Sequence, residues 1–524
     1  MADQPSSQGS DDLNTLVRKQ LDEVTRNSRS INGSLTRYIL NTRTVVEKEW
    51  LKRETFGEKD TRKPHKTILL VGEAGTGKST LINAIINYML GVKCTDRIWC
   101  EIIETKEKQT DSQTKAVTVY DVFIEESPFS FTIIDTPGYG STRGNKDSET
   151  AKILHELCRD EVHEVNVVCL VVSSKMTRLT ARQLYIFDSI LSLFAKDMEG
   201  NIVLLITHAT QKPVNCLKTI KESKVKCAKT DDGKPVYFSF DNSHCEAFNE
   251  EDEDTEYDEE YHKAAWHKNE ENMQNLFAFL NDSKPVSLSL TESVLSTRKQ
   301  LKAVIKNLKE RIEQTELKKK ELEQTKAALE QHEREKNDSN NFECEVEESY
   351  KEKVPIQSKW WLSSKEATCC SVCEENCHYP GCWWVKDVYW CSVITRGRCT
   401  VCTGKCDHTK HVKEGKMYMT KTRKVKKTYE DLKKKYEKES GEKMSLMSRL
   451  ENEIKENERE KTRLVEECYQ CVVTLEKIAL KSESESILQH LDFLIERLKE
   501  TGNTERVQKL EKMKKHATAE SQGM

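Results

Sequence analysis

The sequence predicts a three-layer α/β domain with a mostly parallel sheet, followed by a long α-helical coiled-coil hairpin that carries a small cysteine-rich insert. In the first half of the chain, short apolar runs alternate with helical patterns, which is typical of a sheet covered by helices. In the second half, apolar residues recur at heptad-like spacing among charged residues. Nine of the nineteen cysteines fall between residues 369 and 406, which sets that stretch apart.

The chain has 524 residues, which is enough for two or more domains. The expected parts are an N-terminal helical or disordered segment (1–65), the α/β domain (66–283), a coiled-coil helix (291–337), the insert (342–425), a second coiled-coil helix with an amphipathic helix (428–500) and a charged tail (501–524). Within the first part, apolar spacing predicts two helices between Asp11 and Trp50, separated near Gly33.

A glycine-rich loop follows the first predicted strand, which spans residues 66–71, and precedes a helical pattern. The loop reads Gly72, Glu73, Ala74, Gly75, Thr76, Gly77, Lys78, Ser79 and Thr80. It fits G-x-x-x-x-G-K-[ST] at every fixed position, so we expect it to hold a nucleotide phosphate chain. Its backbone N–H groups and the helix N-terminus would face the phosphate oxygens. Lys78 would contact the β- and γ-phosphates, and the Ser79 hydroxyl would bind Mg²⁺.

A second motif, D-x-x-G, follows a later strand. Residues 117–124 and 129–134 predict adjacent strands, and the second ends in Asp135-Thr-Pro-Gly138. Ligands of open α/β sheets bind at the carboxyl ends of the strands. We therefore expect Asp135 to reach the Mg²⁺ shell and the Gly138 N–H to meet the γ-phosphate.

A polar loop at 109–115 lies between these two motifs and supplies hydroxyl groups. Thr114 is the favoured residue to close on Mg²⁺ and the γ-phosphate, where it would also take part in catalysis with Lys78. Thr110 and Thr118 are the alternatives. Further apolar runs predict strands at 165–172, 201–206 and 236–240, with a helix over 179–194.

These motifs resemble those of P-loop GTPases of the translation-factor-related class, and within that class septins and the immunity-associated AIG-type (GIMAP) family. The likeness rests on GEAGTGKST at 72–80, S-x-T at 112–114 and DTPGYG at 135–140, and it covers about residues 66–245. More narrowly, the layout is similar to AIG-type proteins that have coiled-coil tails and a cysteine-rich insert. The resemblance implies a three-layer P-loop GTPase domain with GTP and Mg²⁺ as cofactors. It also places Thr207 and His208 where these families keep a base-reading motif.

The base-reading position departs from the family pattern. GTPases read guanine with the Asp of N/T-K-x-D, but Thr210 stands at that position here. One hydroxyl cannot make the paired contact, although His208 could still stack on the base, and Asn242 or a partner chain could read it instead. Tyr139 follows Gly138, where a water-orienting Gln stands in Ras-like proteins, so slow hydrolysis is expected.

The helical part shows a seven-residue repeat of leucines at 301, 308, 322 and 329. A second coiled-coil helix is expected within residues 428–500, on the other side of the insert. Two such helices suggest an antiparallel hairpin with the insert at its tip. The alternative is that the helices pair between chains, so self-association through the α/β domain or the coiled coil is expected.

The insert contains C-x-x-C twice, each time with another cysteine four residues on. The candidate zinc ligands are Cys370, Cys373, Cys377, Cys382, Cys399, Cys402, Cys406 and His408, with His378 and His411 close by. Two such half-sites supply enough donors for one or two tetrahedral zinc sites. Disulfides or scattered free thiols are the alternatives.

Composition narrows the partners. A net charge of −4 gives no basic field, so nucleic acid is not an expected partner. The sequence has no apolar run of transmembrane length and no signal peptide, which predicts a cytoplasmic protein.

The leading hypothesis is a GTP-binding switch that acts through its helical tail on a copy of itself or on an unidentified protein. A scaffold with a structural nucleotide site and an ATPase are the alternatives.

Overall fold

The structure is a computed structural model that describes residues 8–31, 35–48, 50–104, 116–139, 146–176, 180–242, 255–334, 343–356, 366–379, 381, 387–391, 393–428, 446–481 and 485–522. The chain forms two compact units. The first unit comprises residues 1–295 together with 478–485 and 521–524, and the second comprises 296–477 and 486–520.

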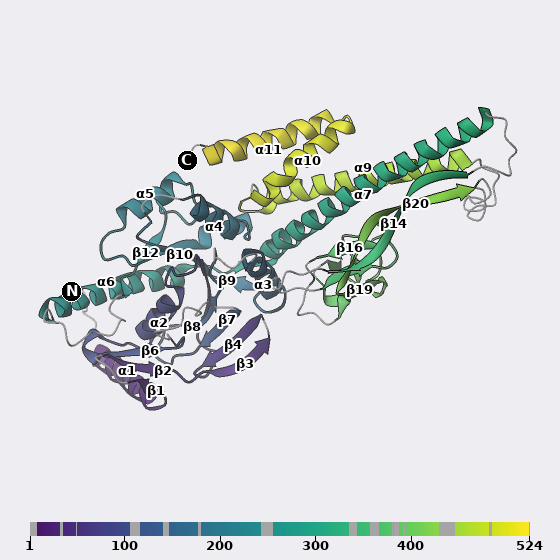
Figure 1. The fold of residues 1–524 in the computed structure, drawn as a ribbon. Helices are drawn as coiled ribbons and strands as arrows, with labels where there is room; N and C mark the ends of the chain where they lie inside the picture. Colours follow the sequence, from purple (N-terminus) through teal and green to yellow (C-terminus); the bar gives the residue numbers. More distant parts are fainter. Residues whose placement is uncertain are drawn as a thin grey trace. The chain divides into compact units, whose positions relative to one another are not determined.

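An eight-stranded mixed sheet forms the centre of the first unit, with the strand order β12-β11-β10-β5-β8-β7-β4-β3 (Figure 1). The strands are β3 (Arg43–Lys48), β4 (Leu51–Phe56), β5 (His65–Gly72), β7 (Val117–Val122), β8 (Ser130–Asp135), β10 (Val167–Ser173), β11 (Ile202–Thr207) and β12 (Tyr237–Ser239). Neighbours run parallel except for the pairs β7–β8 and β3–β4. The predicted α/β fold with a mostly parallel sheet is therefore confirmed.

Helices cover this sheet: α2 (Lys78–Met89), α3 (Lys146–Asp160), α4 (Ala181–Leu191), α5 (Val214–Glu222) and α6 (Thr255–Asp282). Alternate residues of β5, Ile68 and Leu70, share one hydrophobic cluster with α2 and α6. α4 also packs against β5, but its buried Ile186 and Phe187 lie outside that cluster. Because successive strand residues point to opposite faces, α4 covers the other face of the sheet.

The N-terminal region differs from the prediction. A helix is present, α1 (Gln8–Arg26), but the helix expected after Gly33 is wrong. In its place are β1 (Arg29–Ile31), β2 (Thr36–Ile39), β3 and β4, and β1 and β2 form a second sheet with β6 (Ile98–Glu101). The segment is rich in Thr and Val, which favour strands, and a short apolar pattern does not separate helix from strand. The boundary expected at residue 66 therefore falls inside the sheet.

Four helices dominate the second unit and its junctions: α7 (Ser289–Arg334), α9 (Leu446–Ile478), α10 (Glu485–Glu500) and α11 (Thr504–Gln522). α7 and α9 run antiparallel, because Gln300 bonds Glu467 while Arg311, further along α7, bonds Asn457 near the start of α9. The helix pairing is thus made within one chain. None of the helices in the described part of the chain is long and apolar enough to cross a membrane.

Along the chain, the strands of the second unit lie between α7 and α9. They are β14 (Glu343–Pro355), β15 (Ala367–Cys370), β16 (Glu375–His378), β17 (Ile394–Thr395), β18 (Arg398–Cys399), β19 (His411–Glu414) and β20 (Lys416–Thr428). β14 and β20 pair antiparallel over their whole length, and β15 lies between β16 and β19. In the first unit, β9 (Glu164–Val165) pairs with β13 (Val286–Ser287).

The sequence suggested an insert at the tip of a helical hairpin, and the structure differs from this expectation. The β14–β20 ribbon returns along α7: Lys427 binds Glu321 at 2.7 Å, and Gln314 donates to Thr420 at 3.1 Å. The ribbon also continues to Thr428, past the expected boundary at residue 425. Because the ribbon covers polar positions of α7, Glu321 and Thr325 are buried there, whereas Leu322 of the expected heptad seam is only half-buried.

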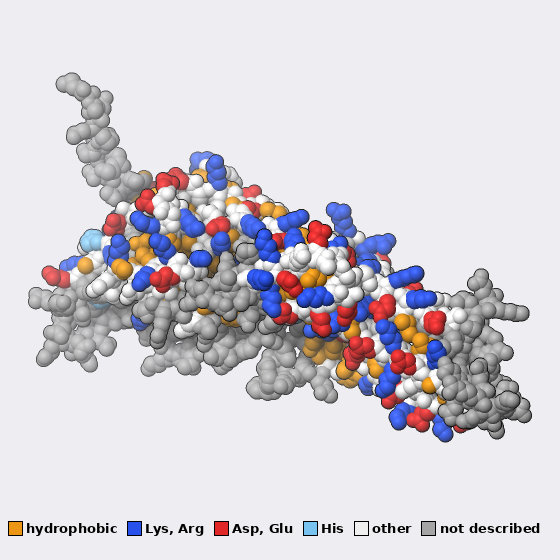
Figure 2. Space-filling view, turned by 90° about the horizontal axis from the view of Figure 1, so that it is seen from above, with side chains coloured by type: hydrophobic (Ala, Val, Ile, Leu, Met, Phe, Trp, Pro, Cys, Tyr) orange, Lys and Arg blue, Asp and Glu red, His pale blue; other side chains and the backbone are white. Residues whose placement is uncertain are grey.

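Charged side chains of both signs cover the surface. Figure 2 shows Lys and Arg side chains beside Asp and Glu side chains over the face that it draws. On the ribbon, for example, Arg423 pairs with Glu348 and Lys421 with Glu352. This mixture agrees with the small net charge of the chain.

A prediction follows from the place of β4 in the sheet. Arg53 of β4 donates to Asp121 of β7 at 2.7 and 3.2 Å, and Asp121 is buried and also accepts from Thr132. Arg53→Ala leaves this carboxylate without its counter-charge, so we expect the first unit to lose about 3 kcal/mol of unfolding free energy. Urea unfolding of the full chain measures it. Arg43→Ala on the exposed strand β3 is the matched control, and equal losses in both variants would contradict the prediction.

Candidate functional site

The glycine-rich loop joins the end of β5 to the start of α2 and so has the strand–loop–helix context of a P-loop. Gly75 and Gly77 have φ angles of 80° and 81°, a left-handed conformation that glycine adopts without strain. A Cβ atom on Gly72 would lie 2.5 Å from the carbonyl oxygen of Val171, so the loop also needs glycine where it approaches β10. The first N–H groups of α2 have no partner within the helix and remain available to a ligand.

Two opposite charges are buried next to this loop. Lys78 donates from Nζ to the carbonyl oxygens of Gly72 and Glu73 at 3.2 and 2.9 Å. Burial lowers the pKa of Lys78 to about 8, and the nearby Asp135 carboxylate opposes this shift. Burial raises the pKa of Asp135 to about 6, against the effect of Lys78. Each charge therefore depends on the other or on a ligand.

The Asp135 side chain fits a role in binding Mg²⁺. Its Oδ1 is buried and makes no hydrogen bond within the part of the chain that the structure describes. Magnesium prefers oxygen ligands, often one or two protein groups completed by water and substrate phosphates. The Ser79 hydroxyl lies in the first turn of α2, so Asp135 and Ser79 are the residues that would hold the ion.

The D-x-x-G segment is bonded directly to the P-loop. Tyr139 donates its N–H to the carbonyl of Gly72, and the Ala74 N–H donates back to the carbonyl of Tyr139, both at 3.0 Å. A Cβ atom on Gly138 would lie 2.5 Å from the Cα of Ala74, so only glycine allows this approach. The two predicted phosphate-binding motifs are therefore in direct contact and joined by backbone hydrogen bonds.

The predicted base-reading residues have different surroundings. The Thr207 hydroxyl is buried and donates to the carbonyl oxygens of Thr76 and Val172, so it supports the P-loop. His208 is exposed with a φ of 52°, and its Nε2 would lie 3.9 Å from a Cβ on Gly77. Thr210 is exposed as well. Of these side chains, His208 is the one that combines exposure with closeness to the loop.

Two residues of α6 near this segment carry no sequence signal. Lys268 donates from Nζ to the carbonyls of Ala209 and Thr210 at 3.2 and 3.4 Å. Asn269 donates to the Asn242 side chain at 3.4 Å. In the sequence they belong to an ordinary polar helix, and only the fold brings them beside the ends of β11 and β12.

Of the three candidates for the switch hydroxyl, one lies in the described part of the chain. Thr114 and Thr110 lie outside the described residues. Thr118, the other alternative, is in β7 and pairs in register with Asp135 of β8.

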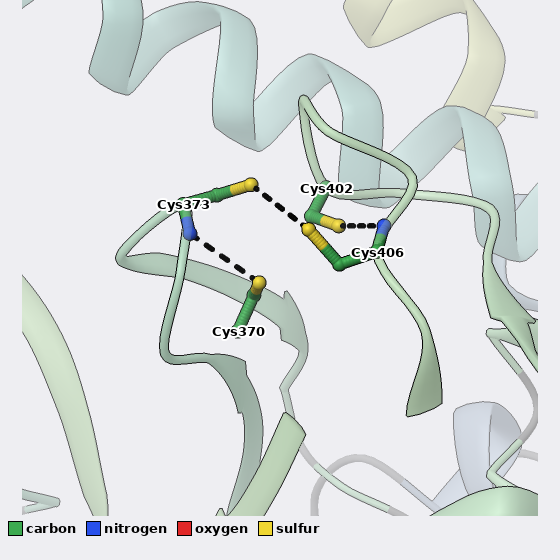
Figure 3. A group of neighbouring side chains, drawn as sticks. All are labelled: Cys370, Cys373, Cys402 and Cys406. Carbon is green, nitrogen blue, oxygen red and sulfur yellow. Dashed lines mark hydrogen bonds between the residues drawn. The ribbon is translucent and has the colours of Figure 1, made fainter. Parts of the chain in front are cut away.

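The cysteines of the insert form two groups that share one member, and Figure 3 shows the four cysteines of one group. The first group is Cys370, Cys373, Cys402 and Cys406, and the second is Cys377, Cys399, Cys402 and His411. In each group the donor atoms all lie within 4.8 Å of one another. The Sγ atoms of Cys373 and Cys406 are 3.6 Å apart, which is too far for a disulfide, and every described cysteine is a free thiol.

Backbone N–H groups point at the sulfur atoms. In both C-x-x-C segments the second cysteine donates its N–H to the sulfur of the first, at 3.4 Å in Cys370–Cys373 and in Cys399–Cys402. Cys402 accepts a further N–H from Cys406 at 3.2 Å. Such donors stabilise thiolates, the form in which cysteine binds metals.

The histidine of the second group is His411 rather than the expected His408. Nδ1 of His411 lies 3.0 Å from the carbonyl of Asp407, and its Nε2 is buried without a hydrogen-bond partner in the described part. This is how a ligating histidine is usually oriented. His408 instead packs on Tyr389 and faces the carbonyl of Gly397, because it lies in the short 3₁₀ helix before β19. Cys382 lies outside the described residues.

Comparisons with known proteins bear mainly on the first unit. A family model described as Septin matches residues 63–169, which include β5, the P-loop, α2 and the D-x-x-G segment. No curated protein matches the chain.

Similar solved structures include Toc33 from Arabidopsis thaliana in complex with Mg²⁺ and GMPPNP, at 19% identity over 43% of this chain and 88% of that chain, with a TM-score of 0.30. Another is translation elongation factor SelB from Methanococcus maripaludis in its apo form, at 11% identity over 43% and 35%, with a TM-score of 0.24. The family-model match over residues 63–169, together with the loop geometry, supports a P-loop GTPase domain in the first unit.

Proposed function

We propose that the first unit binds GTP with Mg²⁺ and acts as a nucleotide-dependent switch. The observation that carries this proposal is the buried pair Lys78 and Asp135, with an Asp135 oxygen that has no hydrogen-bond partner among the described residues. Buried charges without full compensation are unfavourable. A triphosphate would compensate the Lys78 ammonium, and Mg²⁺ would supply positive charge to the Asp135 carboxylate.

Hydrolysis by this site is expected to be slow. Tyr139 occupies the position that follows Gly138, and its side chain is almost fully buried. A buried phenol cannot orient an attacking water as an exposed Gln does in Ras-like proteins. Lys78 would stabilise charge on the phosphates, and Thr114 remains the proposed switch hydroxyl, so a partner in trans would be needed for fast turnover.

A route from the P-loop to the helical tail supports coupling between nucleotide state and the tail. A cavity of about 160 Å³ lies behind the loop, between Gly72, Glu73 and Thr76 on one side and α4 on the other. A cavity leaves room for the loop and α4 to shift against each other, because close-packed interiors do not allow such movement.

The loop after α4 contacts two segments of the first unit: the start of α7, where the chain leaves for the second unit, and the residues after α9, where it returns. Ala195 donates its N–H to the hydroxyl of Thr291 in the first turn of α7, at 3.3 Å. Leu480, just after α9, donates to the carbonyl of Phe194 at 2.9 Å, and Lys481 pairs with Asp188 of α4. A shift of α4 would therefore reach the beginning of α7 and the end of α9 together. We propose that this shift controls binding of a second copy or of another protein.

A second candidate function is a scaffold in which the insert carries the interaction. The two groups of thiols favour it, because zinc commonly occupies tetrahedral sites of Cys and His ligands and stabilises small domains with thin cores. We propose zinc as the metal of the insert. An ATPase activity of the same P-loop remains the other alternative.

The proposed switch is tested by titration of the full chain with GTP, GDP and their Mg²⁺ complexes while its size is measured by light scattering. We expect GTP binding to change the oligomeric state and GDP not to. Lys78→Ala removes the buried ammonium, so its GTP affinity should fall by about 100-fold, from a loss of ~3 kcal/mol. Lys66→Ala at the far end of β5 is the control. If Lys78→Ala binds GTP like the wild type, the proposal fails.

The pKa shifts predict a pH window for binding. With the pKa of nucleotide-free Lys78 at about 8, binding takes up a proton above that pH, because phosphates favour the ammonium. With the pKa of Asp135 at about 6, binding of Mg²⁺ releases a proton below that pH. Affinity for Mg²⁺–GTP should therefore be highest between the two values and fall by up to about tenfold per pH unit outside them.

Calorimetry in buffers of different ionisation enthalpy counts these protons. Lys78→Ala should remove the uptake at high pH, and Asp135→Asn the release at low pH. An affinity that stays constant from pH 5 to pH 9 would contradict both assignments.

Base selectivity gives a further prediction. Without a carboxylate at Thr210, the chain lacks a charge-assisted bond to guanine of about 1.5–3 kcal/mol. We expect GTP to be preferred over ATP only modestly, and Thr210→Asp to strengthen that preference by roughly 10- to 150-fold. Competition binding of GTP, ATP and XTP measures it, with Thr230→Asp on an exposed turn as the control. A wild type that is already strongly selective would show that another group, such as Asn242, reads the base.

A further inference from the structure

The two donor groups of the insert share Cys402, and this shared residue bears on how many metal ions the insert can bind. Together the groups hold six thiols and one imidazole, and Cys402 is the only member common to both. A single tetrahedral ion binds four donors, so one ion would leave three donors of this buried cluster without a partner. His411, whose Nε2 already lacks a hydrogen bond in the described part, would be one of them if the ion occupied the first group.

We propose that the insert holds two zinc ions and that the Cys402 thiolate binds both of them. The first ion would take Cys370, Cys373 and Cys406, and the second Cys377, Cys399 and His411, each with Cys402 as the fourth ligand. The inference rests on the proposal that the insert binds zinc and specifies how it does so. With zinc–sulfur bonds of about 2.3 Å, two ions on one sulfur lie less than about 4.6 Å apart.

The charge balance allows two ions. Six thiolates carry a charge of −6, which two Zn²⁺ ions reduce to −2, the same charge that one ion on the four cysteines of the first group leaves while the other thiols stay protonated. Cys370, Cys377, Cys399 and Cys402 are all buried, so a thiolate among them that bound no ion would be strongly unfavourable. Lys351 and Lys405 lie beside the cluster: Lys351 donates to the carbonyl of Cys373, and Lys405 follows Gly404, whose N–H donates to the Cys373 sulfur.

The Cys399 sulfur accepts two backbone N–H groups, from Val401 and Cys402, and the shared Cys402 sulfur accepts one. Its backbone environment supplies an N–H from Cys406, and both C-x-x-C turns have the same internal N–H to sulfur bond. The two turns therefore have the same local hydrogen bond, but only the Cys399–Cys402 turn supplies a residue to both groups. Cys402 alone faces both the Cys370–Cys373 turn and the Cys377–His411 side.

Metal content of the full chain, purified without chelator, tests the proposal. We expect two zinc ions per chain in the wild type. Cys370→Ala should leave one ion, and His411→Ala should also leave one. Cys402→Ala should retain neither, because both sites then have three ligands. Cys369→Ala is the matched control and should retain two, since the Cys369 thiol faces Asn376 and belongs to neither group.

A spectroscopic measurement on the wild type does not depend on the folding of any variant. Zinc is replaced by Co²⁺, and electron paramagnetic resonance is recorded as the metal is added. A bridging thiolate couples the two Co²⁺ spins, so the signal should rise up to one equivalent and fall as the second is added. A signal that rises in proportion to two equivalents would show two separate ions and overturn the bridge.

The possible outcomes distinguish failure of the shared two-ion centre from failure of zinc binding itself. A folded chain without zinc refutes zinc binding altogether. One ion per chain supports zinc binding but overturns the shared centre. Two ions in the wild type, with one retained in a folded Cys402→Ala variant, also overturn it.

Discussion

The burial of Lys78 and Asp135 is the constraint on which the first unit depends. β5 and β8 lie side by side and run parallel, so the glycine loop and Asp135 emerge at the same edge of the sheet. Backbone bonds between Gly72, Ala74 and Tyr139 then hold the two segments at a fixed spacing. The lowered pKa of the ammonium and the raised pKa of the carboxylate both reflect the burial of these charges beside the loop. A phosphate chain with a divalent cation would compensate both of these buried charges.

The second unit depends in the same way on a polar network rather than on an apolar core alone. Arg311 of α7 donates to Asn457 of α9, to Glu375 of β16 and to Thr403, which lies next to Cys402. Lys405 adds an ion pair to Glu467 of α9 at 2.7 Å. Charged and polar groups therefore hold the helix pair against the segments that carry the cysteine cluster.

Local motifs could be predicted from the sequence, and long-range pairings could not. The P-loop and D-x-x-G segments lie where expected because each is a short pattern that follows a strongly apolar strand. The pairing of β4 with β7 joins residues far apart in the chain, so nothing local separates β4 from a helix. His411 replaces His408 because the register of β19 decides which imidazole meets the thiols. The shared position of Cys402 likewise depends on how the two C-x-x-C turns meet, which their identical spacing does not reveal.

The outer strands of the large sheet limit how copies of this chain can meet. At one edge β3 presents Arg43, Glu47 and Lys48, and Lys48 is paired with Glu161. At the other edge β12 has only three residues. Charged or very short border strands discourage the backbone-to-backbone joining that turns soluble sheets into fibres. Pairing of two copies along the edges of this sheet is therefore disfavoured, which leaves the helices and loops of the first unit as the surfaces for contact between copies.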